Sequence, residues 1–332
     1  MTALSRTRTG LAAAVAAGTL AALASGAAAQ TKVPVPALTF PTVTNTANDI
    51  IIAKGFDKAN GIQLDINPYG AVGAQYSAIA KAEVVAGVLA PYQVAKFRSE
   101  GVPVAIYATF IGMDDTQIVT TNPAIKTIQD LKGKSIAATV GFSSYQYLQI
   151  YTRKYGLTLG TDLTVVNANT ALAQAQLEAG RVDSALLWEP ATTRALTQLK
   201  DARVVINGDE AWKTVTGDRG WDIIAFINLD YAKKTPGVIP KLVAMYKSYA
   251  AFVASNPEEA DAIITSDKYT SKGIPPGSIA TAVKAKRFVP EINPSWEPAA
   301  NKQLWQMMEL GVQENYITTP PRDLIYNEPP AS

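Results

Sequence analysis

Short apolar stretches alternate with helical patterns along most of this chain, and they do so in two successive series. The first series contains four stretches typical of strands, at 38–43, 62–67, 84–89 and 102–110. The second contains six, at 117–120, 135–138, 163–167, 184–187, 203–206 and 222–228. Strands that alternate with helices form mostly parallel sheets covered by helices. We therefore predict an α/β protein with two lobes, each a mostly parallel sheet flanked by helices.

The remainder of the chain has mainly helical patterns. Helices are expected at 238–255, from Pro257 onward, at 276–287 and at 298–315, and the Pro-rich tail from Thr319 is expected to be irregular. Pro91 and Pro190 each suit the first position of a helix, and Asn45 or Thr46 can cap the first one. The stretch between 206 and 222 is interpreted as a Gly-rich loop.

The first 29 residues have the pattern of a secretory signal peptide. Arg6 and Arg8 precede an apolar segment at 11–23, and the small residues Ala27-Ala28-Ala29 form a cleavage site before Gln30. The apolar segment is shorter than the ~20 residues that a membrane-spanning helix needs. We therefore expect export to a Gram-negative periplasm. Without residues 1–29, which hold two Arg and no acidic residue, the chain is formally neutral.

Composition excludes several classes of function. The chain has no His and no Cys, so it cannot build a Ser-His-Asp triad, a thiol nucleophile or a Cys-based metal centre. Its balanced charge offers no electrostatic footprint for nucleic acid. We expect no cofactor, no metal and no nucleic-acid partner.

Four short motifs make the chain resemble a known family. They are Ile-Ile-Ile-Ala-Lys-Gly-Phe at 50–56, Ile-Gln-Asp-Leu-Lys-Gly-Lys-Ser-Ile-Ala at 128–137, Gly-Phe-Ser-Ser-Tyr-Gln-Tyr-Leu at 141–148, and 177–184 together with Trp188-Glu189-Pro190. In this order and spacing they resemble the substrate-binding proteins of ABC importers, in the branch for nitrate, sulfonates, taurine and thiamine-pyrimidine precursors. One departure is the segment 81–87, which lacks the Asp that this family usually has there.

The resemblance implies a type II periplasmic-binding-protein fold with a ligand cleft between the lobes. It implies a monomer that captures a small organic solute (a sulfonate, carboxylate or heterocycle) by lobe closure and delivers it to an ABC permease in the inner membrane. The chain would cross between lobes near 113–117 and 220–223. The segments expected are a signal peptide at 1–29, lobe 1 at 30–115, lobe 2 at 116–221, the return to lobe 1 with C-terminal helices at 222–318, and the tail at 319–332.

Ligands of open α/β sheets bind beyond the carboxyl ends of the strands, which selects candidate residues in both lobes. The candidates in lobe 1 are Thr44, Asn45, Thr46, Tyr69, Pro91 and Tyr92. Those after the second set of strands are Gly141, Phe142, Ser143, Ser144, Trp188, Glu189 and Trp221. Hydroxyls at a helix start can bind anionic or carbonyl groups, although the same residues also serve as plain helix caps. Tyr92 and Trp188 can close on a planar ligand, or can simply be core residues.

Charged residues add little to this picture. Arg153 is interpreted as a solvated helix residue, and Arg219 as neutralised by the neighbouring Asp218 and Asp222. Phe110 is a weaker aromatic candidate. The acidic residues are scattered and mark no catalytic pair. Two alternatives to transport remain open: a ligand sensor that signals to a receptor, and an enzyme built on the same fold.

Overall fold

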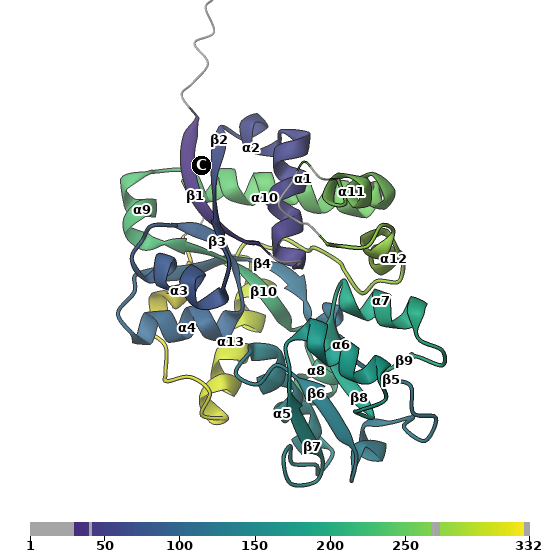
Figure 1. The fold of residues 1–332 in the computed structure, drawn as a ribbon. Coiled ribbons are helices and arrows are strands. Elements are labelled where there is room, and N and C mark those ends of the chain that lie inside the picture. The colour runs from purple at the N-terminus through teal and green to yellow at the C-terminus, as the bar shows by residue number, and fades with distance from the viewer. Residues whose placement is uncertain (1–29, 40–41, 267, 269–272, 329–332) are drawn as a thin grey trace, which may run out of the picture.

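The computed structural model describes residues 30–39, 42–266, 268 and 273–328, and it has two lobes (Figure 1). The signal peptide expected at 1–29 lies outside the described residues. Within the described part, no helix has the length and apolar character needed to span a membrane.

Among the residues that the structure describes, lobe 1 contains five strands in two groups. β1 (Thr31–Leu38) and β2 (Ile62–Tyr69) pair in parallel. β10 (Trp221–Asn228) lies between β3 (Ala86–Leu89) and β4 (Val104–Gly112) and is antiparallel to both. A backbone hydrogen bond of 2.9 Å from the Val85 N–H to the Pro34 carbonyl connects the two groups.

Nine helices in the described part of the chain surround these strands. They are α1 (Val43–Lys54), α2 (Phe56–Ala59), α3 (Val72–Ala80), α4 (Pro91–Ser99), α9 (Leu229–Lys234), α10 (Val238–Ser255), α11 (Pro257–Ile264), α12 (Ser278–Lys284) and α13 (Pro298–Gln313). Figure 1 shows α1 and α10 beside β1 and β2, α11 on the far side of α1, and α3, α4 and α13 nearer the second lobe.

Lobe 2 is built on one five-stranded sheet. Its order is β7 (Thr164–Asn167), β6 (Ser135–Ala138), β8 (Ser184–Trp188), β5 (Thr116–Thr120) and β9 (Arg203–Asn207). The pairs β6–β7 and β6–β8 are parallel, whereas β5 is antiparallel to both of its neighbours. The helices of this lobe are α5 (Ser143–Lys154), α6 (Thr170–Glu178), α7 (Ala191–Gln198) and α8 (Gly208–Thr216).

The chain passes between the lobes twice, and these crossings explain the antiparallel strands. β4 leads through the short 3-10 helix η1 (Met113–Asp115) into β5, and α8 leads back into β10. Because β10 enters lobe 1 where β4 leaves it, the two strands must run in opposite directions. The same holds in lobe 2 for β5, which enters, and β9, which leads to the exit. Among the described strands, the parallel pairing that the alternation of strands and helices predicts is therefore found only between strands that do not adjoin a crossing, in the pairs β1–β2, β6–β7 and β6–β8.

The first strand and its helix lie differently from the prediction. β1 ends at Leu38, whereas a strand was expected at 38–43, of which residues 40–41 lie outside the described residues. The cap of α1 is Thr42, whose hydroxyl accepts a hydrogen bond of 3.3 Å from the Asn45 N–H. The alternation of Val33, Val35 and Ala37, all buried, marks the true strand. As a result, Asn45 and Thr46 lie inside the helix rather than at its cap.

The region interpreted as a Gly-rich loop contains α8. The Asn207 side chain caps this helix by accepting hydrogen bonds of 2.9 Å and 3.3 Å from the N–H groups of Asp209 and Glu210. The helix ends at Gly217, which adopts a left-handed conformation with φ 77°. The glycines at both ends of the segment resemble loop composition, but one starts the helix and the other terminates it.

Candidate functional site

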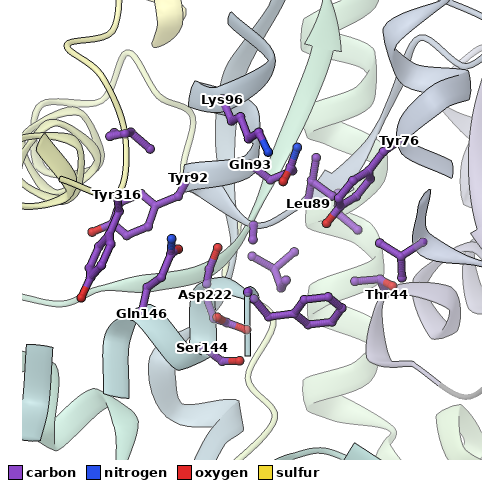
Figure 2. Close-up of a pocket in the computed structure, with 18 of the residues that line it drawn as sticks. Thr44, Tyr76, Leu89, Tyr92, Gln93, Lys96, Ser144, Gln146, Asp222 and Tyr316 are labelled. Carbon is purple, nitrogen blue, oxygen red and sulfur yellow. The ribbon is translucent and has the colours of Figure 1, made fainter. Parts of the chain in front are cut away.

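A cavity of about 840 Å³ lies between the lobes and is lined by residues of both. Lobe 1 contributes Tyr76, Leu89 and the face of α4 that carries Tyr92, Gln93 and Lys96. Lobe 2 contributes the start of α5 and the end of β8, and the segment after α13 closes one side with residues 315–319. Figure 2 shows Asp222 near the middle of this group, with Ser144 and Gln146 on one side and Tyr92 and Gln93 on the other.

Seven residues selected from the sequence line this cavity. They are Thr44, Tyr92, Gly141, Phe142, Ser143, Ser144 and Trp188. Six others do not: Asn45, Thr46, Tyr69, Pro91, Glu189 and Trp221.

Several of the six residues away from the cavity have clear structural contacts. Asn45 is buried, and its side-chain oxygen accepts a hydrogen bond of 2.9 Å from the Leu38 N–H, which connects α1 to the end of β1. Thr46 is buried in the next position of the same helix. Pro91 is buried as the first residue of α4, and Tyr69 ends β2 and packs against the core. Trp221 is fully buried, and its indole N–H donates a hydrogen bond of 3.0 Å to the Gln303 side-chain oxygen.

Glu189 forms a buried ion pair between the lobes. Its carboxylate accepts a hydrogen bond of 2.8 Å from Arg287 Nε and one of 3.0 Å from the Thr193 N–H, and the side chain is fully buried. Burial raises the pKa of Glu189, and the bonds from Arg287 and Thr193 oppose that rise. Because Arg287 follows α12 of lobe 1 and Glu189 follows β8 of lobe 2, this pair holds the lobes together.

The start of α5 presents groups that have no partner within the protein. Gly141 has φ 93°, a left-handed conformation that favours glycine. The cap position is Phe142, which makes no side-chain cap hydrogen bond, so neither Ser143 nor Ser144 caps the helix. Ser144 is 5% exposed, and its hydroxyl has no hydrogen-bond partner. A buried hydroxyl without a partner is unfavourable unless a ligand or water satisfies it.

Aromatic rings form much of the cavity wall. Phe142 stacks on Trp188 with ring centroids 6.1 Å apart and an interplanar angle of 23°. Tyr92 packs against Tyr147 at 5.4 Å and Tyr316 at 6.2 Å. Burial raises the pKa of Tyr92, which is therefore neutral, and its hydroxyl has no hydrogen-bond partner. The walls are thus suited to an apolar or planar organic body.

Arg153 has a defined role that the sequence interpretation missed. It forms an ion pair with Glu314 and donates a hydrogen bond of 2.6 Å to the Tyr316 hydroxyl, so it is not simply a solvated side chain. Because Tyr316 lines the cavity, Arg153 of lobe 2 positions a wall residue that comes from the C-terminal segment.

Arg219 is neutralised by a different set of acids from the one expected. Its guanidinium lies 2.9 Å from Asp114, 3.2 Å from Glu291 and 3.5 Å from Asp209, whereas Asp218 and Asp222 were named from their closeness in sequence. Burial raises the pKa of Asp114 to about 6, while Arg219 opposes the rise. Arg219 therefore joins the crossing segment before β5 to α8 and to the segment after α12.

The structure brings two carboxyl groups together in the cavity, although the sequence indicated no such pair. Asp115 ends η1 and Asp222 is the second residue of β10, so the two crossings place them side by side. Both line the cavity, and each carboxyl group acts on the pKa of the other. Burial, followed by charge repulsion from neighbouring acids, raises the pKa of Asp222 to about 7 and that of Asp115 well above its usual value. Two carboxyl groups held close together in a buried site do not readily ionise at the same time.

Other cavity residues also escaped the sequence interpretation. Examples with polar side chains are Tyr76, Gln93, Lys96, Gln146 and Tyr316. They lie on helix faces or in the C-terminal segment, not at strand ends, so the rule that ligands bind beyond strand ends could not select them. Within the part of the chain that the structure describes, no group of three or more acidic side chains has the arrangement of a metal site.

Comparison with known proteins places the chain among binding proteins. A family model described as "NMT1/THI5 like" matches residues 50–260. The chain is 29% identical over 164 residues to the putative aliphatic sulfonates-binding protein of Escherichia coli, covering 49% of this chain and 47% of that protein. It is 23% identical over 241 residues to the taurine-binding periplasmic protein of Escherichia coli, covering 70% of this chain and 72% of that protein.

Solved structures with the same fold extend the comparison to almost the whole chain. The periplasmic aliphatic sulphonate binding protein SsuA from Escherichia coli superposes with a TM-score of 0.73 at 18% identity, covering 91% of this chain and 94% of that one. At this identity the likeness shows the fold. The sulfonate relative is matched over about half of its own length.

Proposed function

Because this chain belongs to the NMT1/THI5-like family, we propose that it is a periplasmic solute-binding protein that captures a small organic solute and delivers it to an ABC import permease. The observation that carries the proposal is the cavity of about 840 Å³ between the lobes, with walls from both lobes. Closure of the lobes around such a cavity encloses a ligand and changes the surface that a permease contacts.

The relatives support this proposal in two ways. The two matched Escherichia coli proteins are named as binding proteins, one for aliphatic sulfonates and one for taurine. We infer that this chain performs no chemistry and acts as a monomer, with lobe 1 formed by 30–115 and 222–318 and lobe 2 by 116–221. The signal peptide pattern at 1–29 supports export to the periplasm. A ligand sensor would use the same cavity, and permease genes beside this one would favour transport.

A thermal-shift screen tests the proposed function directly. We expect at least one compound in a library of small sulfonates, carboxylates, amines and heterocycles to raise the melting temperature. A ligand at 100 times its Kd adds about 2.7 kcal/mol to the free energy of unfolding. For a chain of this size that corresponds to an increase of about 4 °C. A library in which no compound shifts the melting temperature would contradict the proposal, and so would chemical conversion of the bound compound.

Ser144→Ala tests the cavity as the binding site. Its hydroxyl is buried without a partner, so a ligand that satisfies it loses a hydrogen bond in the variant. We expect affinity for a compound found in the screen to fall by about 1–3 kcal/mol, or roughly 5–150-fold, measured by calorimetry. Stability should barely change, because the hydroxyl makes no bond in the free protein. Ser248→Ala, on the outer face of α10, is the matched control and should bind as wild type. Wild-type affinity in both variants would place the ligand elsewhere.

A further inference from the structure

The charge of the cavity differs from what a plain anion-binding site requires. Two of the residues that line it are acidic, Asp115 and Asp222. Among the described lining residues, Lys96 is the one basic side chain, and it is exposed. Arg219, in the nearby crossing segment, forms ion pairs with Asp114, Asp209 and Glu291 and does not line the cavity. An anion in this cavity would approach carboxyl groups that no arginine neutralises.

The two carboxyl groups are buried in the site and can accept further hydrogen bonds from a donor. Asp115 is 1% exposed and Asp222 is 9% exposed. Burial raises the pKa of both groups, that of Asp222 to about 7, so near neutral pH the pair is partly ionised and carries at most about one negative charge. Carboxylate oxygens accept several hydrogen bonds. Asp115 accepts one of 3.1 Å from the Thr116 hydroxyl, which leaves further acceptor capacity in the pair for a ligand. Burying such a charge is costly unless an opposite charge or a strong donor is placed against it.

Two further polar groups of the residues that line the cavity have no hydrogen-bond partner. The hydroxyls of Ser144 and Tyr92 are buried and have no hydrogen-bond partner, and both residues line the cavity. Figure 2 shows Asp222 between them, so a polar group bound to the pair would lie within the same cluster. The rings of Phe142 and Trp188 form a stacked apolar wall beside it.

From this arrangement we infer that the ligand carries a cationic N–H donor, an ammonium, amidinium or guanidinium group, which binds the Asp115–Asp222 pair. Its organic body packs on the aromatic walls, and its polar edge satisfies the hydroxyls of Ser144 and Tyr92. This inference rests on the proposed function and specifies the chemical class of the solute.

Three probes with one ring and different charges test the inference: benzamidine, benzamide and benzenesulfonate. Calorimetry should show binding in the order benzamidine, then benzamide, then benzenesulfonate, with about tenfold or more between the cation and the neutral amide. Asp222→Asn should remove this preference for the cation, while Asp218→Asn, outside the cavity, should keep it.

A second measurement uses only the wild-type protein. A bound cation favours the ionised pair, so binding of benzamidine should release a proton, detected as a heat that depends on the ionisation enthalpy of the buffer. Its affinity should increase as the pH rises through about 7, where Asp222 loses its proton. The other titratable groups that act on the pair are Asp114 and Glu189, and the pair in turn acts on Tyr147 and Tyr151 of α5.

The outcomes separate this inference from the proposed function. Benzenesulfonate binding as tightly as benzamidine overturns the inference and leaves the solute-binding function intact. Failure of benzamidine to bind, or to release a proton on binding, also overturns it. The proposed function itself fails if the wider library contains no compound that stabilises the protein, or if the protein converts the compound it binds.

Discussion

Replacing Arg287 with methionine should lower the free energy of unfolding by about 3–5 kcal/mol, because it leaves a buried carboxylate without its cation. The Glu189 side chain is fully buried, and Arg287 Nε lies 2.8 Å from it. Methionine keeps most of the length of the side chain, so the loss of charge pairing dominates over the loss of packing. Chemical denaturation followed by Trp fluorescence measures the change.

Two comparisons isolate the buried pair. Lys284→Met removes the ion pair between Lys284, at the end of α12, and Glu258 of α11. Both side chains are mostly exposed, at 61% and 66%, so we expect a much smaller loss. The double variant Glu189→Gln/Arg287→Met replaces both charges and should recover most of the stability. Equal losses for Arg287→Met and Lys284→Met would show that burial of the pair has no energetic consequence.

The loss in Arg287→Met should also depend on pH. Burial already raises the pKa of Glu189, and removing Arg287 takes away the charge that opposes this rise. A carboxyl whose pKa is higher in the folded state stabilises the fold at low pH and loses this contribution as the pH rises through the folded pKa. The variant should therefore be most destabilised at alkaline pH and should regain stability under mildly acidic conditions. A deficit that does not change with pH would contradict an unpaired carboxylate as its cause.

Gly208→Ala should be the most damaging small substitution at the crossings, with a loss of about 3 kcal/mol. A Cβ at this position would lie 2.4 Å from the Met113 carbonyl oxygen and 2.8 Å from that of Thr116. Both contacts are with backbone atoms of the segment that links the lobes, so no side chain can rotate to make room. Because the clash pushes on this segment, we also expect weaker ligand binding in the variant.

Gly73→Ala is the matched control for this substitution. Gly73 lies within α3, and a Cβ there would meet nothing within 4 Å. Alanine is the better helix former, so this variant should gain about 0.5–1 kcal/mol. Thermal unfolding of the two variants should thus shift in opposite directions. A Gly208→Ala protein within about 0.5 kcal/mol of wild type would mean that the crossing segment moves freely at that point.

Local patterns in the sequence were sufficient for most of the secondary structure. β6 lies at Ser135–Ala138 and α10 at Val238–Ser255, both with the predicted bounds, and α11 begins at the predicted Pro257. Hydrophobic periodicity and helix-start residues act over a few neighbouring positions, so they can be recognised without the fold. α8 was missed because its two terminal glycines resembled loop composition, although one of them terminates the helix.

The candidate site was only partly accessible from sequence. Strand ends and helix starts selected Thr44, Tyr92, the 141–144 turn and Trp188, which line the cavity. The same rule also selected Glu189 and Trp221, which lie beside the cavity in chain position but direct their side chains into an ion pair and a core contact. A position after a strand end defines a region, whereas the direction of a side chain depends on what packs around it.

The sequence by itself determined the two α/β lobes, because periodic burial of apolar residues is encoded locally in each strand and helix. Only the tertiary structure decided the chemistry of the cavity. Asp115 and Asp222 belong to different crossings, separated by all of lobe 2, and they meet because the chain leaves and re-enters lobe 1 at the same place. Tyr316 comes to the cavity from beyond α13, held by Arg153 of lobe 2. These contacts join residues that are remote in the chain, so no local pattern records them, and burial at the meeting point then sets their protonation.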